Sequence, residues 1–314
     1  MASILKPVLN VRIILFIFLW IFVSVLTHAD QNDLYKEDYL LPPDAVQNIL
    51  NRDSHFDILS NLSPDKNHLM IPVSADFSSL ELMTQKTYRL GMLELCPDVN
   101  REWRLSTYGI KGLKIFSIEK KKSWAVQLPE DILISDMVWS PDGEKIAFLA
   151  HLRNGTQVWI ADVESGKVKV LNETFVMATL TVRRRYSRNA IASPSQMLQW
   201  TPKGSIVTLL VPSDRGPEPE KNPIPDSPII RHTREKATPT PTFPFLLRTS
   251  YDKELFRYYT TSQLAELAPG IPPRAIGEPS MYMNISMSPD GQYILAERLT
   301  ESFSHIVSYT NFPR

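Results

Sequence analysis

The sequence has little of what cofactor, metal and nucleic-acid sites require. It holds one cysteine among 314 residues, so no disulfide can form within the chain, and we interpret Cys96 as a small buried apolar residue. Lysine plus arginine and aspartate plus glutamate number 34 each, which leaves no basic face for a nucleic acid. No Gly-rich phosphate loop occurs, and the six histidines lack the spacing of metal ligands. The sequence therefore predicts no cofactor, no metal site and no nucleic-acid partner.

Long hydrophobic runs are also absent. The longest, Ile13 to Leu26, is shorter than the roughly 20 residues of a transmembrane helix. Lys6 and Arg12 precede it, and Thr27-His28-Ala29 follows with small residues around a cleavage point. This layout is that of a secretory signal peptide over residues 1–29, so the sequence predicts a secreted protein. The alternatives are an uncleaved membrane anchor and import into an organelle, although the segment lacks the Arg- and Ser-rich composition of a transit peptide.

Glycine is scarce, with 11 residues, whereas proline is frequent, with 25. This composition predicts many turns and few long helices. The phrase Ser-Pro-Asp-Gly occurs at residues 140–143 and 288–291, and degenerate copies begin at Ser63 and Thr201. Each copy precedes an apolar, strand-like run, which indicates stacked or radially arranged β-units. Because proline and aspartate suit tight turns, we interpret Asp142 and Asp290 as turn residues and not as catalytic carboxylates.

Residues 137–171 form the clearest unit. The strand-like runs 137–139, 145–150, 157–163 and 167–171 are separated by the phrase, by an Asn-Gly hairpin turn and by a Glu-Ser-Gly turn. Four antiparallel strands in so short a span match one blade of a β-propeller. A sandwich of Greek-key sheets is the alternative, but a sandwich has no reason to repeat one turn. The predicted fold class is therefore all-β, a partial β-propeller of four-stranded antiparallel blades.

The organisation that we predict has three parts: the signal peptide at 1–29, a lead with a short helix at 30–55, and incomplete blades over 56–314. Pro43, Asp44 and the apolar spacing up to Leu50 indicate the short helix. The copies of the phrase lie further apart than one blade of about 40–50 residues, so loops are inserted, chiefly a Pro-rich insertion at 212–244. Further strands are expected at 69–73, 90–95 and 113–118, and a helix or two short helical turns at 251–267.

Several residues could be read as sites. Three Asn-X-Ser/Thr triplets make Asn154, Asn172 and Asn284 candidate N-glycosylation sites in a eukaryotic host. We interpret the run Arg183–Arg185 as a solvated loop, with a processing site or an anion-binding loop as the alternatives. Arg298 could meet a substrate carboxylate, but a surface pair with Glu297 or Glu301 is the plainer account.

The three tryptophans Trp139, Trp159 and Trp200 read as packing between blades. No histidine stands beside a candidate nucleophile, so no catalytic residue is assigned.

The ordered stretches of the sequence resemble a known family. They are Leu41–Pro43, Tyr88–Leu93, Val138–Phe148, Asp214–Pro217, Asp252–Leu264 and Glu297–Leu299. Together they resemble the N-terminal β-propeller of prolyl oligopeptidase-type serine peptidases, most closely the glutamyl endopeptidase branch. The resemblance implies a propeller that caps an α/β-hydrolase domain with a Ser, Asp and His triad.

The sequence departs from that pattern because it has no Gly-x-Ser-x-Gly nucleophile elbow. The resemblance then implies the gating part of a peptidase that acts on peptides, and its glutamyl endopeptidase branch implies cleavage after Glu. The catalytic domain of that peptidase would be missing from this chain. Its partners would be peptide substrates, reached through that missing domain. The alternative is a stand-alone propeller that binds a partner protein without catalysis, and a third is a relic that does not fold. The sequence leaves the oligomeric state open.

Overall fold

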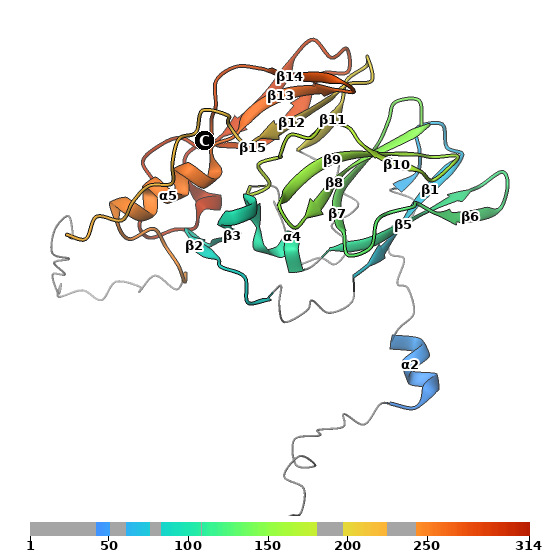
Figure 1. Cartoon of the computed structure of the whole chain (residues 1–314), viewed down its shortest axis with the longest axis horizontal. Helices are drawn as coiled ribbons and strands as arrows, with labels where there is room; N and C mark the ends of the chain where they lie inside the picture. Colours follow the sequence, from blue (N-terminus) through green and yellow to red (C-terminus); the bar gives the residue numbers. More distant parts are fainter. Residues whose placement is uncertain (1–41, 51–60, 76–82, 108, 181–196, 225–242) are drawn as a thin grey trace, which may run out of the picture. The chain divides into compact units, whose positions relative to one another are not determined.

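A computed structural model describes residues 42–50, 61–75, 83–107, 109–180, 197–224 and 243–314 (Figure 1). The chain divides into two units, Met1–Arg52 and Asp53–Arg314. In the first unit, helix α2 spans Asp44–Leu50. It begins directly after two prolines, and the amides of Val46 and Gln47 donate to the carbonyl of Pro43. The expected short helix is confirmed, whereas the signal segment 1–29 lies outside the described residues.

The predicted central blade is confirmed in the second unit. Strands β7 (Leu133–Trp139), β8 (Lys145–Leu152), β9 (Gly155–Asp162) and β10 (Val168–Val170) pair in chain order, each antiparallel to the next. One detail of the prediction is wrong. Leu152 pairs with Gly155, so the two turn residues are Arg153 and Asn154, and Gly155 already belongs to β9.

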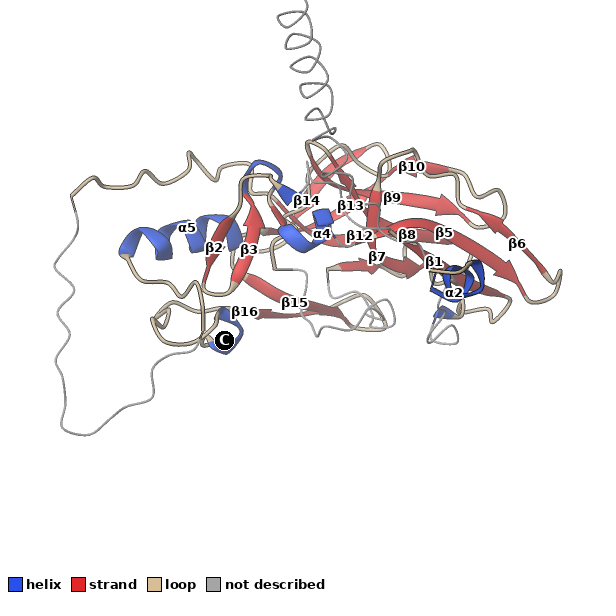
Figure 2. Ribbon diagram, turned by 90° about the horizontal axis from the view of Figure 1, so that it is seen from below, coloured by secondary structure: helices blue, strands red, loops and turns tan. Residues whose placement is uncertain are grey.

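Similar sheets precede and follow this blade. Before it, β1 (His68–Ser74), β5 (Ile110–Ser117) and β6 (Lys122–Ala125) pair in that order, and Ile110 joins them to Ile134 of β7. After it, β11 (Leu198–Trp200), β12 (Ile206–Leu210), β13 (Gln263–Ala268) and β14 (Ile271–Ala275) form a second four-stranded blade. The hairpin of β15 (Tyr282–Met287) and β16 (Ile294–Arg298) begins another. All these pairs are antiparallel, as Figure 2 lets the reader follow, and the all-β fold class is confirmed.

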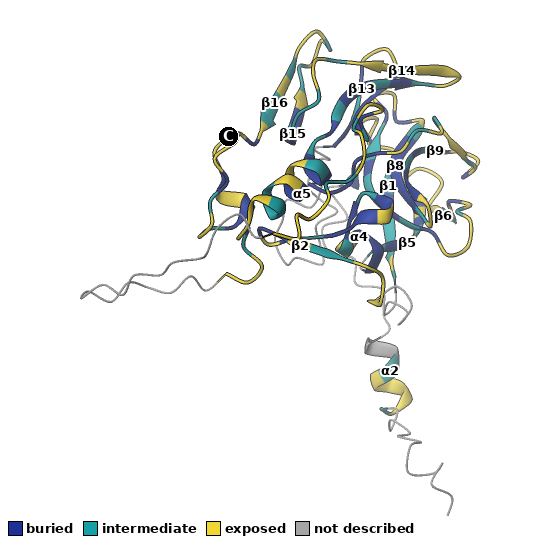
Figure 3. Ribbon diagram, turned by 60° about the vertical axis from the view of Figure 1, so that its left-hand side comes forward, coloured by how far each residue is buried: buried dark blue, intermediate teal, exposed yellow. Residues whose placement is uncertain are grey.

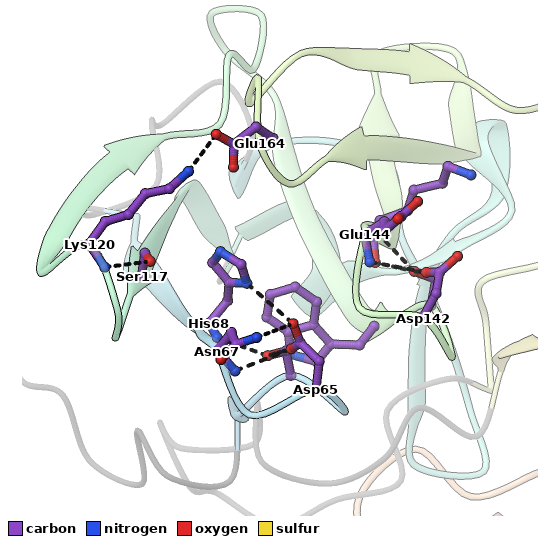
Figure 4. A network of polar contacts seen from close by, with 12 residues as sticks. Asp65, Asn67, His68, Ser117, Lys120, Asp142, Glu144 and Glu164 are labelled. Atoms are coloured by element: carbon purple, nitrogen blue, oxygen red, sulfur yellow. Dashed lines mark hydrogen bonds and ion pairs between the residues drawn. The ribbon is translucent and has the colours of Figure 1, made fainter.

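The repeated phrase builds the same turn in three places. At Ser140, the hydroxyl accepts from the amide of Lys145 at 2.8 Å and donates to the carboxylate of Asp142 at 2.5 Å. The same carboxylate accepts from the amide of Glu144 at 3.0 Å. Equivalent hydrogen bonds join Ser63 to Asp65 and His68, and Ser288 to Asp290 and Tyr293. Figure 4 shows Asp65 and Asp142, the aspartates of the first two of these turns. The interpretation of Asp142 and Asp290 as turn residues is confirmed, and the serine hydrogen bond lowers the pKa of both carboxyl groups.

The fourth position of the phrase explains its glycine. The φ angle there is 75° at Gly143, 80° at Gly204 and 70° at Gly291, and 62° at Lys66 in the first copy. Glycine adopts this left-handed region freely, whereas a residue with a Cβ is strained there. The copy at Thr201 is one residue shorter, since the Thr201 amide donates to Ser205 and no aspartate extends the turn.

Adjacent blades are joined at the residue before each phrase. The indole of Trp139 donates to the carbonyl of Asn61 at 3.1 Å, and that of Trp200 donates to Val138 at 3.2 Å. Both acceptors lie two residues before the phrase of the preceding blade. Met287 has no N–H in its side chain, and there the Gln199 amide bridges instead to the backbone of Met287 and Ile285, at 2.7 Å each. Trp139 and Trp200 therefore pack between blades, as predicted.

A second row of contacts joins the outer hairpins of the first two blades. Lys120 forms an ion pair with Glu164 at 2.6 Å (Figure 4). Beside it, the indole of Trp124 donates to the carbonyl of Val163 at 2.8 Å. The ion pair is solvent-exposed and contributes little, so the indole bond and the packing around it hold this edge.

Within the second unit, two insertions and the segment after β16 pack together beside the blades, and we call this region the insertion module. The first insertion, between β1 and β5, carries β2 (Tyr88–Leu90), β3 (Leu93–Cys96), β4 (Arg101–Glu102) and α4 (Trp103–Thr107). The second, between β12 and β13, carries α5 (Ser250–Thr260). Figures 1 and 2 both place α5 beside β2 and β3.

The module has its own hydrophobic core. Its members come from all three segments and, in addition, from the chain after β10 (Leu180) and from β15 and the residue before it (Met281 and Met283): Leu90, Leu93, Leu95, Leu180, Leu247, Leu255, Phe256, Tyr259, Met281, Met283, Leu299, Phe303, Tyr309 and Phe312. Phe256 is fully buried at its centre, and its ring contacts those of Phe303 and Phe312 edge to face. Figure 3 shows the buried side of α5 against the exposed outer side. Burial of this aromatic cluster is what holds segments so distant in sequence together.

Two predictions fail in this module. The expected strand at 90–95 is a hairpin, because Gly91 and Met92 adopt φ angles of 59° and 75°. The expected helix at 251–267 ends at Thr260, and its second half is β13. A capping box between Thr249 and Asp252 starts this helix, but pairing of Gln263–Ala268 with strands on both sides overrides the local helical pattern.

Candidate functional site

Three of the stretches that carry the family resemblance meet in the insertion module. Tyr88 comes from β2, Arg215 and Glu218 from the described start of the Pro-rich insertion, and Tyr259 from α5. The carboxylate of Glu218 accepts a hydrogen bond from the Tyr88 hydroxyl at 2.5 Å and from the Tyr259 hydroxyl at 2.8 Å. One carboxylate thus links three segments that are far apart in the sequence.

The positive charges of Lys86 and Arg215 act on this carboxylate. The guanidinium of Arg215 lies 4.1 Å from the ring centre of Tyr258 and 5.6 Å from that of Tyr259. It also donates to the side-chain oxygen of Asn100 at 2.6 Å. Lys86 lies 4.9 Å from the ring centre of Tyr88. Both cations thus lie over aromatic rings, and the hydrogen-bond acceptor of Arg215 is a neutral amide.

The electrostatics fit an ionised Glu218 between two neutral phenols. Burial alone would raise the pKa of Glu218, but the two tyrosine hydrogen bonds and the charges of Lys86 and Arg215 lower it overall. The hydrogen bond to Glu218 raises the pKa of Tyr88, and burial together with the same carboxylate raises that of Tyr259. Both hydroxyls therefore remain protonated donors at neutral pH, which is the state that binds a carboxylate.

A surface hollow adjoins this cluster. It is lined by Thr87, Tyr88, Arg89 and Leu90 from β2 and the residue before it, and by Tyr251, Asp252 and Leu255 from α5. Tyr88 belongs both to the hollow and to the Glu218 contact. The arrangement can bind a carboxyl group and an apolar or aromatic neighbour, but it contains no nucleophile with a positioned base.

One histidine does contact a serine, although not as a catalytic pair. The two ring nitrogens of His151 lie 3.1 Å from the Thr156 hydroxyl and 3.0 Å from the Ser135 hydroxyl, and Ser135 donates to Asp136 at 2.8 Å. Burial and the charge of Arg101 lower the pKa of His151 well below its usual value. The ring is bridged by two hydroxyls with no carboxylate to orient it, so this is a structural hydrogen-bond chain.

Two other buried groups have structural roles. Cys96 is 2% exposed, its thiol lies 3.9 Å from the Ser106 hydroxyl, and burial raises its pKa, which confirms the interpretation as a buried apolar residue. Arg101, 4% exposed, donates to Ser106 and to the carbonyls of Leu152 and Gly155 at the β8–β9 turn. Burial lowers the pKa of Arg101 to about 10.

The candidate glycosylation residues lie in different surroundings. Asn154 is exposed in the β8–β9 turn. The amide nitrogen of Asn172 donates to the carbonyl of Ile271 at 3.1 Å, and its oxygen accepts from Thr174. Asn284, in β15, lines a second surface hollow together with Arg298. Asn154 is thus the most accessible of the three, and all three remain predictions.

Two charged candidates remain, Arg298 and the run 183–185, and only Arg298 lies among the described residues. Arg298 is exposed at the end of β16, while Glu297 pairs with Arg314 at 2.5 Å and Glu301 with Arg257 at 2.8 Å. The run 183–185 lies outside the described residues. Among the residues that the structure describes, no group of histidine, cysteine and acidic side chains could hold a metal ion, and no helix is long and apolar enough to cross a membrane.

The sequence reasoning missed Glu218 and its tyrosines. The signal was present, since Tyr88, Arg215 and Tyr259 lie in stretches that carry the resemblance. What pattern reasoning lacks is the tertiary contact, because Tyr88 and Glu218 are separated by 130 positions in the chain.

Comparison with known proteins agrees with the resemblance. No family model matches the chain. It is 27% identical over 286 residues to a probable chloroplastic glutamyl endopeptidase of rice, Oryza sativa, covering 88% of this chain and 29% of that protein. A probable chloroplastic glutamyl endopeptidase of Arabidopsis thaliana is 26% identical over 285 residues, with 88% and 28% covered. The chain spans less than a third of the length of these relatives.

Solved structures with a similar arrangement include TolB from Acinetobacter baumannii, at 9% identity and a TM-score of 0.35, covering 75% of this chain and 36% of that one. A prolyl endopeptidase matches at 13% identity and a TM-score of 0.32, covering 59% and 22%. An acylaminoacyl peptidase from Pyrococcus horikoshii matches at 15% and 0.27, covering 74% and 33%.

The class defined by the antiparallel blades and their repeated turn is the β-propeller. Within that class, the chain is related to the propeller portion of prolyl oligopeptidase-type peptidases, in the branch of the glutamyl endopeptidases, and the recognition made from the sequence is confirmed. The names of both plant relatives include an organelle, the chloroplast. This is compatible with the organelle alternative and gives no support to secretion, which stays a prediction.

Proposed function

We propose that this chain is the propeller portion of a serine-type peptidase that acts on peptides and cleaves after glutamate. The observation that carries the proposal is the similarity to two glutamyl endopeptidases along 88% of the chain. The blades would limit access to a catalytic site outside this sequence, admitting peptides and excluding folded proteins. Rigid blades suit that role, because a scaffold joined by repeated inter-blade bonds such as Trp139 to Asn61 resists opening.

The test measures cleavage of a short Glu-containing peptide and of its Gln counterpart by the full-length product of the gene. We expect cleavage after Glu that a serine-reactive phosphonate abolishes, and much slower cleavage of the Gln peptide. Residues 1–314 alone should cleave neither peptide, because the sequence has no nucleophile elbow. Equal cleavage of both peptides would contradict the specificity, and absence of phosphonate-sensitive cleavage would contradict the peptidase role.

The alternative is a propeller that binds a partner protein without catalysis. One observation favours it: on the β15–β16 hairpin, Tyr293 and Leu295 are 72% and 77% exposed. Large exposed apolar side chains at a sheet edge mark contact surfaces. The same cleavage assay separates the two functions, because a binding module has no phosphonate-sensitive activity in any length of product.

Localisation is a separate proposal. If residues 1–29 direct the chain into the secretory pathway, they are removed there as a signal peptide. The alternative is import into an organelle, which would match the chloroplast in the names of the two plant relatives. A fusion of residues 1–29 to a fluorescent protein, expressed in the host cell, distinguishes secretion from organelle import by its site of accumulation.

A further inference from the structure

Glu218 lies between two prolines in a segment that resembles an extended peptide. It lies in the segment Gly216-Pro217-Glu218-Pro219-Glu220, and a residue before proline is held in the extended region of the backbone. Gly216 and Pro217 are exposed, as is Glu220, while Glu218 is half-buried. The segment therefore lies on the surface of the module with one carboxylate turned inward.

The groups that receive this carboxylate are positioned without it. The ring of Tyr259 packs against those of Tyr88 and Tyr258, with ring centres 5.6 and 4.9 Å apart. Tyr259 is 3% exposed and belongs to the module core with Leu255. Because packing fixes the two hydroxyls, they would still point to the same place if Glu218 moved away.

Arg215 stays in place when the following residues move. Its contacts with Asn100 and Tyr258 anchor it, and the Tyr258 hydroxyl also donates to the carbonyl of Gly216 at 3.2 Å. Beyond Gly216, the hydrogen bonds that hold Glu218 to the described residues are the two that its carboxylate accepts from Tyr88 and Tyr259. Between Arg215 and Glu218, Gly216 adopts a φ of 74° and has open space around its Cβ position. The segment can therefore lift at Gly216 without disturbing the blades.

We propose that Tyr88, Tyr259, Lys86 and Arg215 form a receptor for an acidic side chain, which Glu218 fills from within the chain. A glutamate of a peptide takes the same place when residues 217–220 lift. Two protonated hydroxyls flanked by cations select a carboxylate over an amide, because an amide offers less charge to both. The choice of a peptide as ligand rests on the proposed function, whereas the receptor itself rests on the contacts above.

The test is peptide binding to the full chain, which requires no cleavage. The probe is a fluorescent Gly-Pro-Glu-Pro peptide, with Gly-Pro-Gln-Pro as its counterpart, measured by fluorescence anisotropy. In the wild type the segment competes with the probe, and in Glu218→Ala the receptor is vacant. If the segment is lifted in about one wild-type molecule in ten, Glu218→Ala should lower the apparent dissociation constant of the probe roughly tenfold.

The matched control is Glu220→Ala, which removes an exposed acid two residues away and should bind the probe as the wild type does. Adding Tyr88→Phe and Tyr259→Phe to Glu218→Ala should abolish the gain. A Glu218→Ala chain with unchanged circular dichroism that binds neither peptide, or binds both equally, overturns the proposal. If that variant does not fold, Glu218→Gln keeps the size of the side chain, and the same readouts apply.

The outcome is independent of the cleavage assay. Specific binding by Glu218→Ala with no peptidase activity in the full-length product would keep the receptor and remove the proposed function. Cleavage after Glu with no gain in binding would do the reverse.

Discussion

In the central blade, β7 to β10, each strand pairs with its neighbour in the chain, and the turn at Ser140 is repeated at Ser63 and Ser288. In the insertion module, the groups that meet come from segments as far apart as Tyr88 and Glu218. The blades are therefore held by local hydrogen bonds that recur from unit to unit, and the module by one aromatic core and one carboxylate. The comparison shows that the regular blades act as a scaffold, whereas the groups that could bind a ligand lie in the insertions.

The largest expected effect separates the two regions. Phe256→Ala removes the centre of the module core, and Phe148→Ala removes an equally buried ring of the blade core. Each should lower the free energy of unfolding by about 3–5 kcal/mol, since both create a large cavity. Hydrogen exchange should then differ: Phe256→Ala should expose amides of α5 and β2 while β8 and β9 stay protected. Equal loss of protection in both regions by Phe256→Ala would show that blades and module unfold as one body.

The same contrast decides how much the sequence could predict. The turn phrase, the blade at 137–171 and the short helix follow from local chemistry, because Ser140 and Asp142 make the turn from their own side chains. The module could not be predicted this way. The hairpin at Gly91 and the end of α5 are set by contacts with distant segments, and the Glu218 receptor exists only once three such segments meet.

The next effect tests the inter-blade packing of the turns. At Gly291, an added Cβ would lie 2.5 Å from the Pro202 ring, whereas at Gly204 nothing lies within 4 Å. Both have left-handed φ angles, so Gly204→Ala should cost only the backbone strain of about 1–2 kcal/mol. Gly291→Ala should cost more, because the turns of adjacent blades must also move apart. Chemical denaturation of the two variants measures the difference, and equal costs would mean that the turn contact adds nothing.

A smaller change should stabilise the first blade. Lys66 occupies the position where the other copies have glycine, with a φ of 62°. Lys66→Gly relieves this strain but adds freedom to the unfolded chain, so we expect a net gain of at most about 1 kcal/mol. Thermal unfolding of Lys66→Gly beside Lys66→Ala provides the measurement. A loss of stability in the glycine variant relative to alanine would contradict the assigned turn geometry.

The smallest effect concerns pH and the module. The pKa of Glu218 is lowered from 4.5, so its contribution to stability is present above that value and is lost as the pH falls below it. The groups around it are the hydroxyls of Tyr88 and Tyr259, the cations Lys86 and Arg215, and Tyr251. The stability difference between the wild type and Glu218→Gln should therefore be largest at neutral pH and shrink below about 4.5. A difference that does not change with pH would mean that the Glu218 charge plays no part.

The central claim, that the blades admit peptides and exclude folded proteins, is tested most directly by one comparison with the full-length product of the gene. The rate of cleavage after Glu is measured in a short peptide and in the same sequence placed on the surface of a stably folded protein. The account predicts cleavage of the peptide, and of the folded protein only after it is unfolded. Equal rates for the peptide and the folded protein would contradict it.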